Sequence, residues 1–154
     1  MADKSKLGME FPAYTFTVEK DKIAEFAIAV SQKENKEQIN PIYYDEEAAK
    51  KAGYQGIPIP PTFPISTFFW TGGGLMATVK TLGIDLNKLL HREEEYEYFG
   101  SIYAGDVITR KMKVVDMLKK GKRDKIVEVT VLETDLINQR GELVLKSRTR
   151  LMER

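Results

Sequence analysis

The sequence contains no cysteine and only one histidine, His91, among its 154 residues. Without cysteine the chain can form neither a disulfide nor a thiolate nucleophile, and it offers no sulfur ligand to a metal ion. A single histidine also excludes a site built from several imidazoles. We therefore expect neither a metal ion nor a cofactor, and the chain holds few of the groups that most enzymes use for catalysis.

Neither sign of charge predominates, because 24 lysines and arginines stand against 23 aspartates and glutamates. The formal net charge of +1 gives no electrostatic reason to expect binding to nucleic acid or to an anionic membrane. No apolar run approaches the roughly 18 residues of a membrane span, and the N-terminal residues include no apolar segment typical of a signal peptide. These absences predict a cytoplasmic protein that binds neither membranes nor nucleic acids.

The composition suits a globular domain, since hydrophobic residues make up 42% of the chain and aromatic residues 10%. A chain of this length can bury about two thirds of its unfolded surface in one core. We find no internal repeat, low-complexity tract or flexible linker that would divide it. Residues 1–154 are therefore expected to form a single domain.

The first half of the chain combines short structured segments with loops. Residues 11–18 alternate apolar and polar side chains as a strand does, and residues 19–31 carry apolar side chains at helical spacing. Asp45 is expected to cap a short helix that ends at Gly53. Four prolines in residues 56–64 predict an extended path after it.

Residues 65–82 are apolar on nearly every side, which predicts a helix that other elements enclose. The triplet Gly72-Gly73-Gly74 interrupts this segment and predicts a break, a second helix start or a close backbone contact.

The second half holds four segments with one-sided alternation, at residues 93–99, 107–118, 126–136 and 142–152. Four such strands joined by short turns form an antiparallel sheet with one face in water. The apolar helix is the natural partner for the dry face. The sequence thus predicts an α+β fold, in which a curved antiparallel sheet wraps around a long apolar central helix.

Several motifs follow one another along nearly the whole chain. They are the loop Asn40-Pro41-Ile42, followed by Asp45 and Gly53; the segment Pro60-Pro61-Thr62-Phe63-Pro64; the segment Leu90-His91-Arg92-Glu93; and Ala104-Gly105-Asp106. Together with the order of the expected elements, they resemble the hot-dog fold of the MaoC-like hydratase/dehydratase family, and in particular its N-terminal dehydratase-like subfamily. The resemblance implies a loop that overhangs the hot-dog sheet, and an acyl thioester of coenzyme A or of an acyl carrier protein as ligand.

The chain departs from this family at the two positions that carry the chemistry. Members that react use an Asp and a His of an Asp-x-Asn-Pro-(Ile/Leu)-His loop to hold and deprotonate the water that adds to an enoyl thioester. Here Gln38 and Tyr43 occupy these positions. An amide has no useful basicity, and a phenol with a pKa of about 10 is a poor base at neutral pH.

The resemblance then implies a subunit without a catalytic Asp/His pair of its own. Such a subunit would belong to an (R)-specific 3-hydroxyacyl dehydratase or enoyl hydratase. It would form a heterodimer with a catalytic MaoC-like subunit, and a homodimer of the isolated chain could stand in for that pair.

Further residues are candidates for binding the acyl thioester, and each has a structural alternative. The tyrosines would line the acyl path or pack on the short helix, and Thr62 would offer its N–H to the thioester oxygen or form a rigid entry to the central helix. His91, with Glu93 as its natural partner, would bind substrate or lie in a solvated strand. The substrate-binding candidates are Tyr43, Tyr44, Pro61, Thr62, Phe63, His91 and Glu93.

Other functions stay open on the sequence. An active homodimer could hydrate enoyl thioesters, or act as a thioesterase, through Tyr43, His91 and Glu93. Thioesterase chemistry usually requires an Asp or Glu on the central helix, and residues 65–82 contain neither, which disfavours it. A non-catalytic acyl-CoA sensor would bind the same ligand but would have no catalytic partner subunit.

Overall fold

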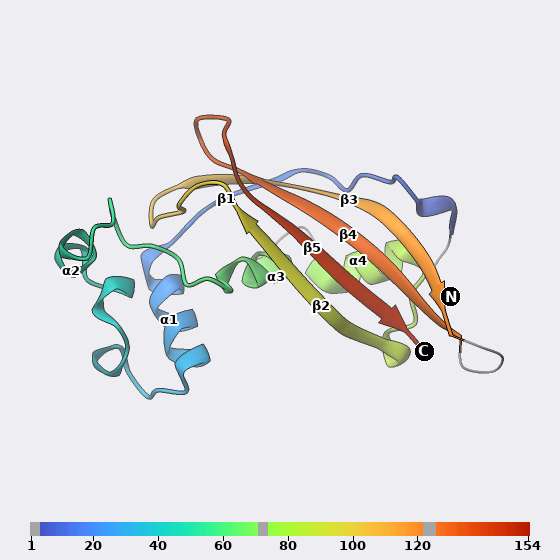
Figure 1. Cartoon of the computed structure of the whole chain (residues 1–154), viewed down its shortest axis with the longest axis horizontal. Coiled ribbons are helices and arrows are strands. Elements are labelled where there is room, and N and C mark those ends of the chain that lie inside the picture. Colours follow the sequence, from blue (N-terminus) through green and yellow to red (C-terminus); the bar gives the residue numbers. More distant parts are fainter. Residues whose placement is uncertain (1–3, 71–73, 122–125) are drawn as a thin grey trace.

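The computed structural model describes residues 4–70, 74–121 and 126–154 (Figure 1). In these ranges a five-stranded antiparallel sheet runs in the order β1-β3-β4-β5-β2. The strands are β1 (Tyr14–Thr17), β2 (Leu89–Tyr98), β3 (Val107–Lys120), β4 (Val127–Ile137) and β5 (Leu143–Glu153). The antiparallel sheet is therefore confirmed, and each segment expected to be a strand overlaps one of these strands.

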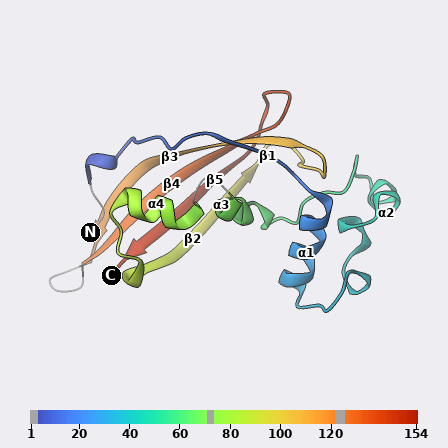
Figure 2. The same ribbon diagram turned by 180° about the vertical axis from the view of Figure 1, so that it is seen from behind.

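The helices of the described ranges are α1 (Lys20–Ser31), α2 (Glu46–Lys51), α3 (Thr67–Trp70) and α4 (Gly74–Leu82), with short 3-10 helices η1 (Lys4–Lys6), η2 (Lys36–Gln38), η3 (Pro41–Tyr43), η4 (Phe63–Ser66) and η5 (Leu86–Lys88). None of these helices is long and apolar enough to cross a membrane. Helices α3 and α4 lie across one face of the sheet, while α1, α2 and the loops around them extend beyond one of its ends (Figure 2). This layout confirms the predicted α+β fold with an overhanging segment.

The short helix α2 begins and ends where the sequence predicts. The Oδ1 atom of Asp45 accepts hydrogen bonds from the N–H groups of Glu47 at 2.9 Å and Ala48 at 3.2 Å. These bonds satisfy donors that the start of a helix leaves without an intrahelical partner. After the helix, Gly53 has a φ of +93°, a conformation that glycine adopts without steric cost.

The proline-rich segment is extended over its first part only. Pro58 forms an isolated antiparallel bridge with Tyr103, beside the turn that precedes β3. Pro64, in contrast, stands in the first turn of η4, where the missing N–H costs no hydrogen bond. The extended path predicted for residues 56–64 therefore stops before the central helix begins.

The central segment is helical but divided. Helix α3 ends at Trp70, and α4 begins at Gly74 with a φ of +60°. A Cβ atom at Gly74 would lie 3.4 Å from the carbonyl oxygen of Phe69, so the two pieces pack closely. A second helix start, one of the outcomes predicted for the glycine triplet, is thus observed at Gly74, while Gly72 and Gly73 lie outside the described residues.

The central helix is not enclosed on every side in this chain. Val79 and Leu82 of α4 are buried against the sheet. On the other side Phe69 is 66% exposed and Met76 is 59% exposed. Full enclosure was predicted from composition, and it fails here because a sheet covers only one side of a helix.

Two apolar clusters fill the space between the helices and the inner face of the sheet. The first cluster is built around Phe63 and includes Ile23 of α1 and Leu145 of β5. The second cluster joins Val79 of α4 to Leu132 of β4. Between the two clusters the strands contribute buried polar side chains, which are Arg110, Thr134, Ser147 and Thr149.

Candidate functional site

The Asn-Pro loop forms a tight turn within the overhanging segment. Asn40 caps η3, and its side-chain oxygen accepts the N–H of Ile42 at 3.2 Å. Pro41 takes the first position of the turn, where a proline has no hydrogen bond to lose. The Asn-Pro pair thus fixes the backbone between Gln38 and Tyr43, the two positions at which reacting MaoC-like proteins carry Asp and His.

Gln38 is exposed, and its side chain is engaged within its own loop. Its Oε1 atom accepts a hydrogen bond from the backbone N–H of Glu34 at 3.1 Å. An amide accepts and donates hydrogen bonds but takes up no proton at neutral pH. Gln38 can therefore orient a polar group, but it cannot act as a general base.

Tyr43 is half-buried and packs against the first apolar cluster. Burial raises the pKa of its hydroxyl above the ordinary value, and the neighbouring Tyr54 adds to the shift. The phenol stays protonated at neutral pH, so it can donate a hydrogen bond but is a poorer base than a free tyrosine. Tyr44 is also half-buried, and the Nζ atom of Lys36 lies 5.9 Å from the centre of its ring.

The entry to the central helix is tied to the end of β2. The hydroxyl of Tyr98 donates a hydrogen bond of 2.8 Å to the carbonyl oxygen of Pro61, and burial raises the pKa of Tyr98 to about 12. Thr62 is exposed, whereas Phe63 is buried and donates its N–H to the carbonyl oxygen of Pro60 at 3.0 Å. Because the N–H of Phe63 is already hydrogen-bonded to the backbone, the N–H of Thr62 is better placed to donate a hydrogen bond to a ligand.

An open groove lies between the segment that leads into the central helix and the end of β2, with Tyr54 of the overhanging segment also in its wall. Its volume is about 480 Å³. Most of its walls are apolar or aromatic, and they include Tyr54, Pro58, Ile59, Pro61, Tyr98 and Phe99. Exposed aromatic side chains of this kind provide a surface for an apolar ligand or a protein partner.

The single histidine lies toward the opposite end of β2. A bulge between His91 and Glu93 shifts the pairing of this strand with β5. Glu93 is half-exposed, and its carboxylate lies 3.4 Å from a guanidinium nitrogen of Arg150. The side chain of Glu94 is only 13% exposed, and its Oε2 atom lies 3.1 Å from Nε2 of His91. The partner of His91 is therefore Glu94 rather than Glu93, the partner expected from the sequence.

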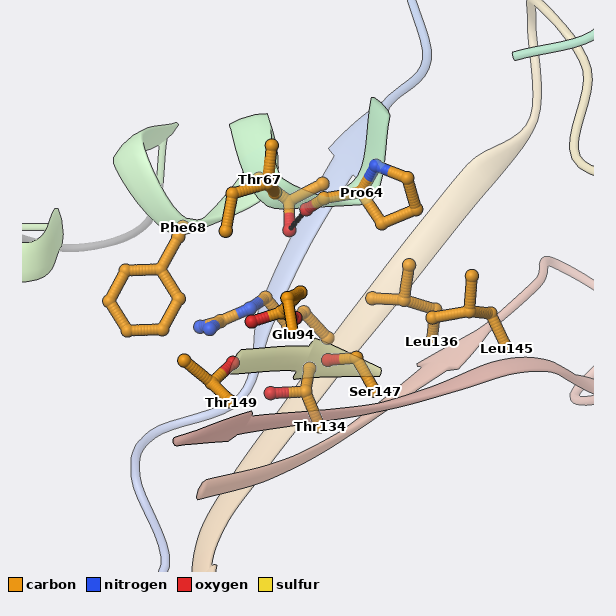
Figure 3. Close-up of a pocket in the computed structure, with 11 residues that line it drawn as sticks. Pro64, Thr67, Phe68, Glu94, Thr134, Leu136, Leu145, Ser147 and Thr149 are labelled. Carbon is orange, nitrogen blue, oxygen red and sulfur yellow. Dashed lines mark hydrogen bonds between the residues drawn. The ribbon is translucent and has the colours of Figure 1, made fainter. Parts of the chain in front are cut away.

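Glu94 borders a small polar cavity beneath α3, which the sequence analysis did not identify. The volume of about 10 Å³ has room for one water molecule. Figure 3 shows the side chain of Glu94 on the side of the strands that faces Thr67, with the ring of Phe68 beside it. The other polar side chains of its walls are Thr67, Arg110, Thr134, Ser147 and Thr149. Strand alternation could have shown that Glu94 faces inward, since Glu94 shares a strand face with Tyr96.

Arg110 of β3 is a buried cation beside this cavity. Its guanidinium lies 4.9 Å from the centre of the Phe68 ring, and its Nη2 atom lies 3.1 Å from Sδ of Met112. Burial lowers the pKa of Arg110 to about 10, although the negative charge of Glu94 opposes that shift. The side chain therefore remains charged at neutral pH.

The candidate binding residues lie in separate places. The tyrosines belong to the overhanging loop, and residues 61–63 belong to the entry of the central helix, next to Tyr98. His91 precedes Tyr98 by seven positions in β2, which corresponds to roughly 20 Å along a strand. The structure thus separates His91 and Glu93 from the other candidates. In the described part of the chain, no group of three or more His, Asp or Glu side chains could hold a metal ion.

Comparisons with known proteins agree with this fold. A protein-family model described as FAS1-like, dehydratase domain region, matches residues 5–147. A UPF0336 protein of Thermobifida fusca is 32% identical over 139 residues, which are 90% of this chain and 84% of that protein. A UPF0336 protein of Streptomyces avermitilis is 30% identical over 153 residues, which are 99% of this chain and 95% of that protein.

Solved structures show the same hot-dog architecture at lower sequence identity. A chain of the HadBC (3R-hydroxyacyl-ACP dehydratase) complex of Mycobacterium tuberculosis matches with a TM-score of 0.75 and 22% identity, over 96% of both chains. A MaoC-like dehydratase of Rhodospirillum rubrum matches with a TM-score of 0.64 and 21% identity, over 96% of this chain and 91% of that chain. A chain of the ChsH1-ChsH2 complex of Mycobacterium tuberculosis matches with a TM-score of 0.63 and 14% identity, over 96% of this chain and 98% of that chain.

Proposed function

The chain belongs to the family of FAS1-like dehydratase domain regions, a MaoC-like hot-dog family, and from this premise we propose that it is the acyl-thioester-binding, non-catalytic subunit of a dehydratase. The complete enzyme is an (R)-specific 3-hydroxyacyl dehydratase or enoyl hydratase of the cytoplasm. The chain acts as one domain over residues 1–154 and pairs with a subunit that supplies the Asp/His pair. Its ligand is an acyl thioester of coenzyme A or of an acyl carrier protein.

The observation that carries this proposal is the chemistry of the Asn-Pro loop. Gln38 cannot take up a proton, and its amide is bonded to the backbone of Glu34. Tyr43 has a raised pKa because it is half-buried, so it is no substitute for an imidazole. Loss of a general base removes a contribution of roughly 10²- to 10⁴-fold to the rate. A chain that retains the fold and lacks this contribution is suited to binding rather than to turnover.

The apolar groove beside the loop supports a role in binding the acyl group. Tyr54, Pro61 and Tyr98 contribute walls to it. Tyr43 lies close enough to Tyr54 that Tyr54 raises the pKa of Tyr43. Tyr44 follows Tyr43 in the chain and Thr62 follows Pro61, and we include both in the proposed binding surface. An apolar groove with a few hydroxyl groups matches the needs of an acyl chain that ends in a polar thioester.

Two surfaces of the isolated chain support a partner subunit. Phe69 and Met76 expose apolar surface on the side of the central helix away from the sheet. In the described part of the chain, strand β2 forms an edge of the sheet. An edge strand can pair with a strand of a second chain. HadBC and ChsH1-ChsH2, which share this fold, are named as complexes. A heterodimer with a catalytic MaoC-like subunit would cover such surfaces.

The test is hydration of trans-2-enoyl-CoA, followed by the loss of absorbance of the conjugated thioester. The chain is assayed alone, with a MaoC-like subunit that carries an intact Asp/His loop, and with the same subunit after its loop histidine has been replaced by alanine. Of these three samples we expect activity only in the mixture with the intact loop. The intact subunit is also assayed alone, and we expect the mixture to be faster than it.

Other results would favour the rival functions. Hydration by the chain alone would overturn the proposal and indicate an active homodimer, and release of free coenzyme A would indicate a thioesterase. Binding of acyl-CoA without any subunit that co-purifies from the native host would indicate a sensor.

A further inference from the structure

Charged side chains form two rows across the outer face of the sheet, at the less buried positions of its strands. The pairing of the strands places one residue of each of four strands in each row. From β3 to β2, the first row contains Lys113, Glu133, Arg148 and Glu95, and the second row contains Lys111, Asp135, Lys146 and Glu97. In both rows the sign of the charge alternates from strand to strand, and both rows end with a glutamate on β2.

Ion pairs follow the first row. Carboxylate oxygens of Glu133 lie 3.4 Å from Nζ of Lys113 on one side and 3.2 Å from Nε of Arg148 on the other. A guanidinium nitrogen of Arg148 in turn lies 3.5 Å from Oε1 of Glu95. Beyond β3, Glu10 forms an isolated antiparallel bridge with Lys113, so an acid stands at that end of the row too. Glu133 shows that one carboxylate of the row takes cations from both neighbouring strands.

The rows stop at β2, the last strand of the sheet in the described part of the chain (Figure 1). Glu95 has cations on the side of β5 only, where Arg148 and Arg150 each lie at 3.5 Å, and its side chain is 52% exposed. Glu97 is exposed and takes part in no ion pair among the described residues. Its register partner Lys146 is bonded instead to two carboxylates of β4. The open side of β2 therefore presents two carboxylates to any strand that joins the sheet there.

We propose that the open edge of β2 pairs with a strand of the catalytic subunit that places lysine or arginine next to Glu95 and Glu97. A carboxylate has about four lone-pair sites, so each glutamate can accept a cation from the new strand as well as from β5. The alternation of charge would then continue across the interface, as it does between the strands of the chain itself. The inference rests on the proposed function for the identity of the partner, and it adds the chemistry of the strand that this partner must present.

A second copy of the chain fits this edge poorly. Two copies related by a two-fold axis would pair β2 with β2 in antiparallel orientation. Pairing centred on Glu95 sets Glu95 opposite itself and Glu93 opposite Glu97, and pairing centred on Tyr96 sets Glu95 opposite Glu97 twice. Like charges directly opposite one another destabilise a pair of strands. The acidic edge therefore favours a different subunit over a copy of the same chain.

The first experiment needs no partner subunit. The double variant Glu95→Gln with Glu97→Gln removes the two charges and keeps the size of the side chains. Glu93 is left unchanged because it already has Arg92 at 3.3 Å and Arg150 at 3.4 Å. Analytical ultracentrifugation measures self-association in about 50 mM and about 500 mM NaCl. We expect the double variant to self-associate about tenfold more tightly than the parent chain at the lower concentration, and the difference to shrink at the higher one because salt screens exposed charges.

The second experiment measures the complex with a MaoC-like subunit that carries the intact Asp/His loop. We expect the double variant to bind this subunit about tenfold more weakly than the parent chain, and with a smaller dependence on salt. The control variant Glu25→Gln with Glu37→Gln removes the same charge from exposed positions of α1 and η2. It should change neither self-association nor binding to the catalytic subunit.

Several results would overturn this inference. They are equal self-association of the parent chain and the double variant, equal binding of both to the catalytic subunit, or an equal change in the control variant. A parent complex that forms but does not depend on the two charges would overturn this inference alone. A parent chain that forms no complex would overturn the proposed function and the identity of the partner, while the self-association experiment would still decide whether the charges of β2 act against a second copy.

Discussion

The hydroxyl of Tyr98 donates a 2.8 Å hydrogen bond to the carbonyl oxygen of Pro61. The bond joins the end of β2 to the entry of the central helix, two segments separated by 37 positions in sequence. It also fixes one wall of the apolar groove beside the overhanging loop. The local geometry of the proposed acyl-binding surface therefore depends on a single phenol.

Replacing Tyr98 by phenylalanine should lower the free energy of unfolding by about 0.5–1.5 kcal/mol, the usual net value of one hydrogen bond. Urea denaturation at pH 7 measures this change. Tyr54→Phe, on the other side of the groove, is the matched control and should change stability by less than about 0.5 kcal/mol. Equal effects of the two substitutions would contradict a specific role for the Tyr98 bond.

The same tyrosine predicts a dependence of stability on alkaline pH. Burial raises the pKa of Tyr98 from 10.0 to about 12 in the folded chain. Between these values the unfolded chain loses the proton and the folded chain keeps it, so the stabilisation is complete below pH 10 and declines as the pH rises toward 12. Unfolding free energies between pH 9 and 11 should fall more steeply for the parent chain than for Tyr98→Phe.

Lys146 holds together an ion-pair cluster on the outer face of the sheet. Its Nζ atom lies 3.0 Å from Oε1 of Glu133 and 2.5 Å from Oδ1 of Asp135. Removing the cation with Lys146→Met leaves both carboxylates without this partner and should cost about 1–3 kcal/mol at pH 7. Lys111→Met, at an exposed position of the neighbouring β3, is the control and should cost little.

Acid titration tests the origin of that loss. Burial raises the pKa of Glu133, but hydrogen bonds from Lys146 and Lys113 outweigh it and hold the pKa below the ordinary 4.5. The stabilisation is thus present above pH 4.5 and is lost as the pH falls through the folded pKa. The difference between the parent chain and Lys146→Met should shrink on acidification, and a constant difference would point to packing instead.

Local signals explain why much of the fold could be predicted. Asp45 caps α2 through bonds to residues two and three positions ahead, so the sequence alone contains the motif. Strand alternation likewise identifies β3, β5 and the second half of β4, where buried and less buried positions largely alternate. The Asn-Pro turn is also local, and it places Gln38 and Tyr43 on the overhanging segment.

Features that depend on distant pairing escaped prediction. The bulge between His91 and Glu93 arises where β2 meets β5. Strand alternation could have placed Glu94 on the face of Tyr96, but no local pattern reveals the bulge or the contact of Glu94 with His91. Alternation places Arg110 on the inner face of β3 with Ile108 and Met112, but only the tertiary structure shows that Phe68 lies over its guanidinium. The separation of His91 from the overhanging loop likewise follows from the path of β2 through the sheet.

His91 and Tyr43 distinguish a binding subunit from an active homodimer. If the chain only binds, His91→Ala and Tyr43→Phe should change the kcat of the mixture with a catalytic subunit by no more than about twofold. If either residue is a general acid or base, kcat should fall by roughly 10²- to 10⁴-fold. Steady-state hydration assays at saturating enoyl-CoA separate the two cases.

The uncovered side of the central helix should be part of the interface with the catalytic subunit. Phe69 and Met76 are more than half exposed, so aspartate at both positions should change the stability of the isolated chain by less than about 0.5 kcal/mol. The same charges would have to be desolvated in the complex, which should weaken it about tenfold or more. Analytical ultracentrifugation measures this loss, with Lys80→Ser on α4 as the control.

Restoring the Asp/His pair is the most direct test of why we expect the isolated chain to lack hydratase activity. The double variant Gln38→Asp with Tyr43→His recreates the loop of the reacting family on a backbone that the Asn40 cap already holds in a tight turn. We expect it to hydrate enoyl-CoA at least about tenfold faster than the parent chain, while each single variant stays at the parent rate because the two groups act as a unit. Activity in Tyr43→His alone would contradict this account. It would show that the imidazole suffices and that Gln38 can orient the water.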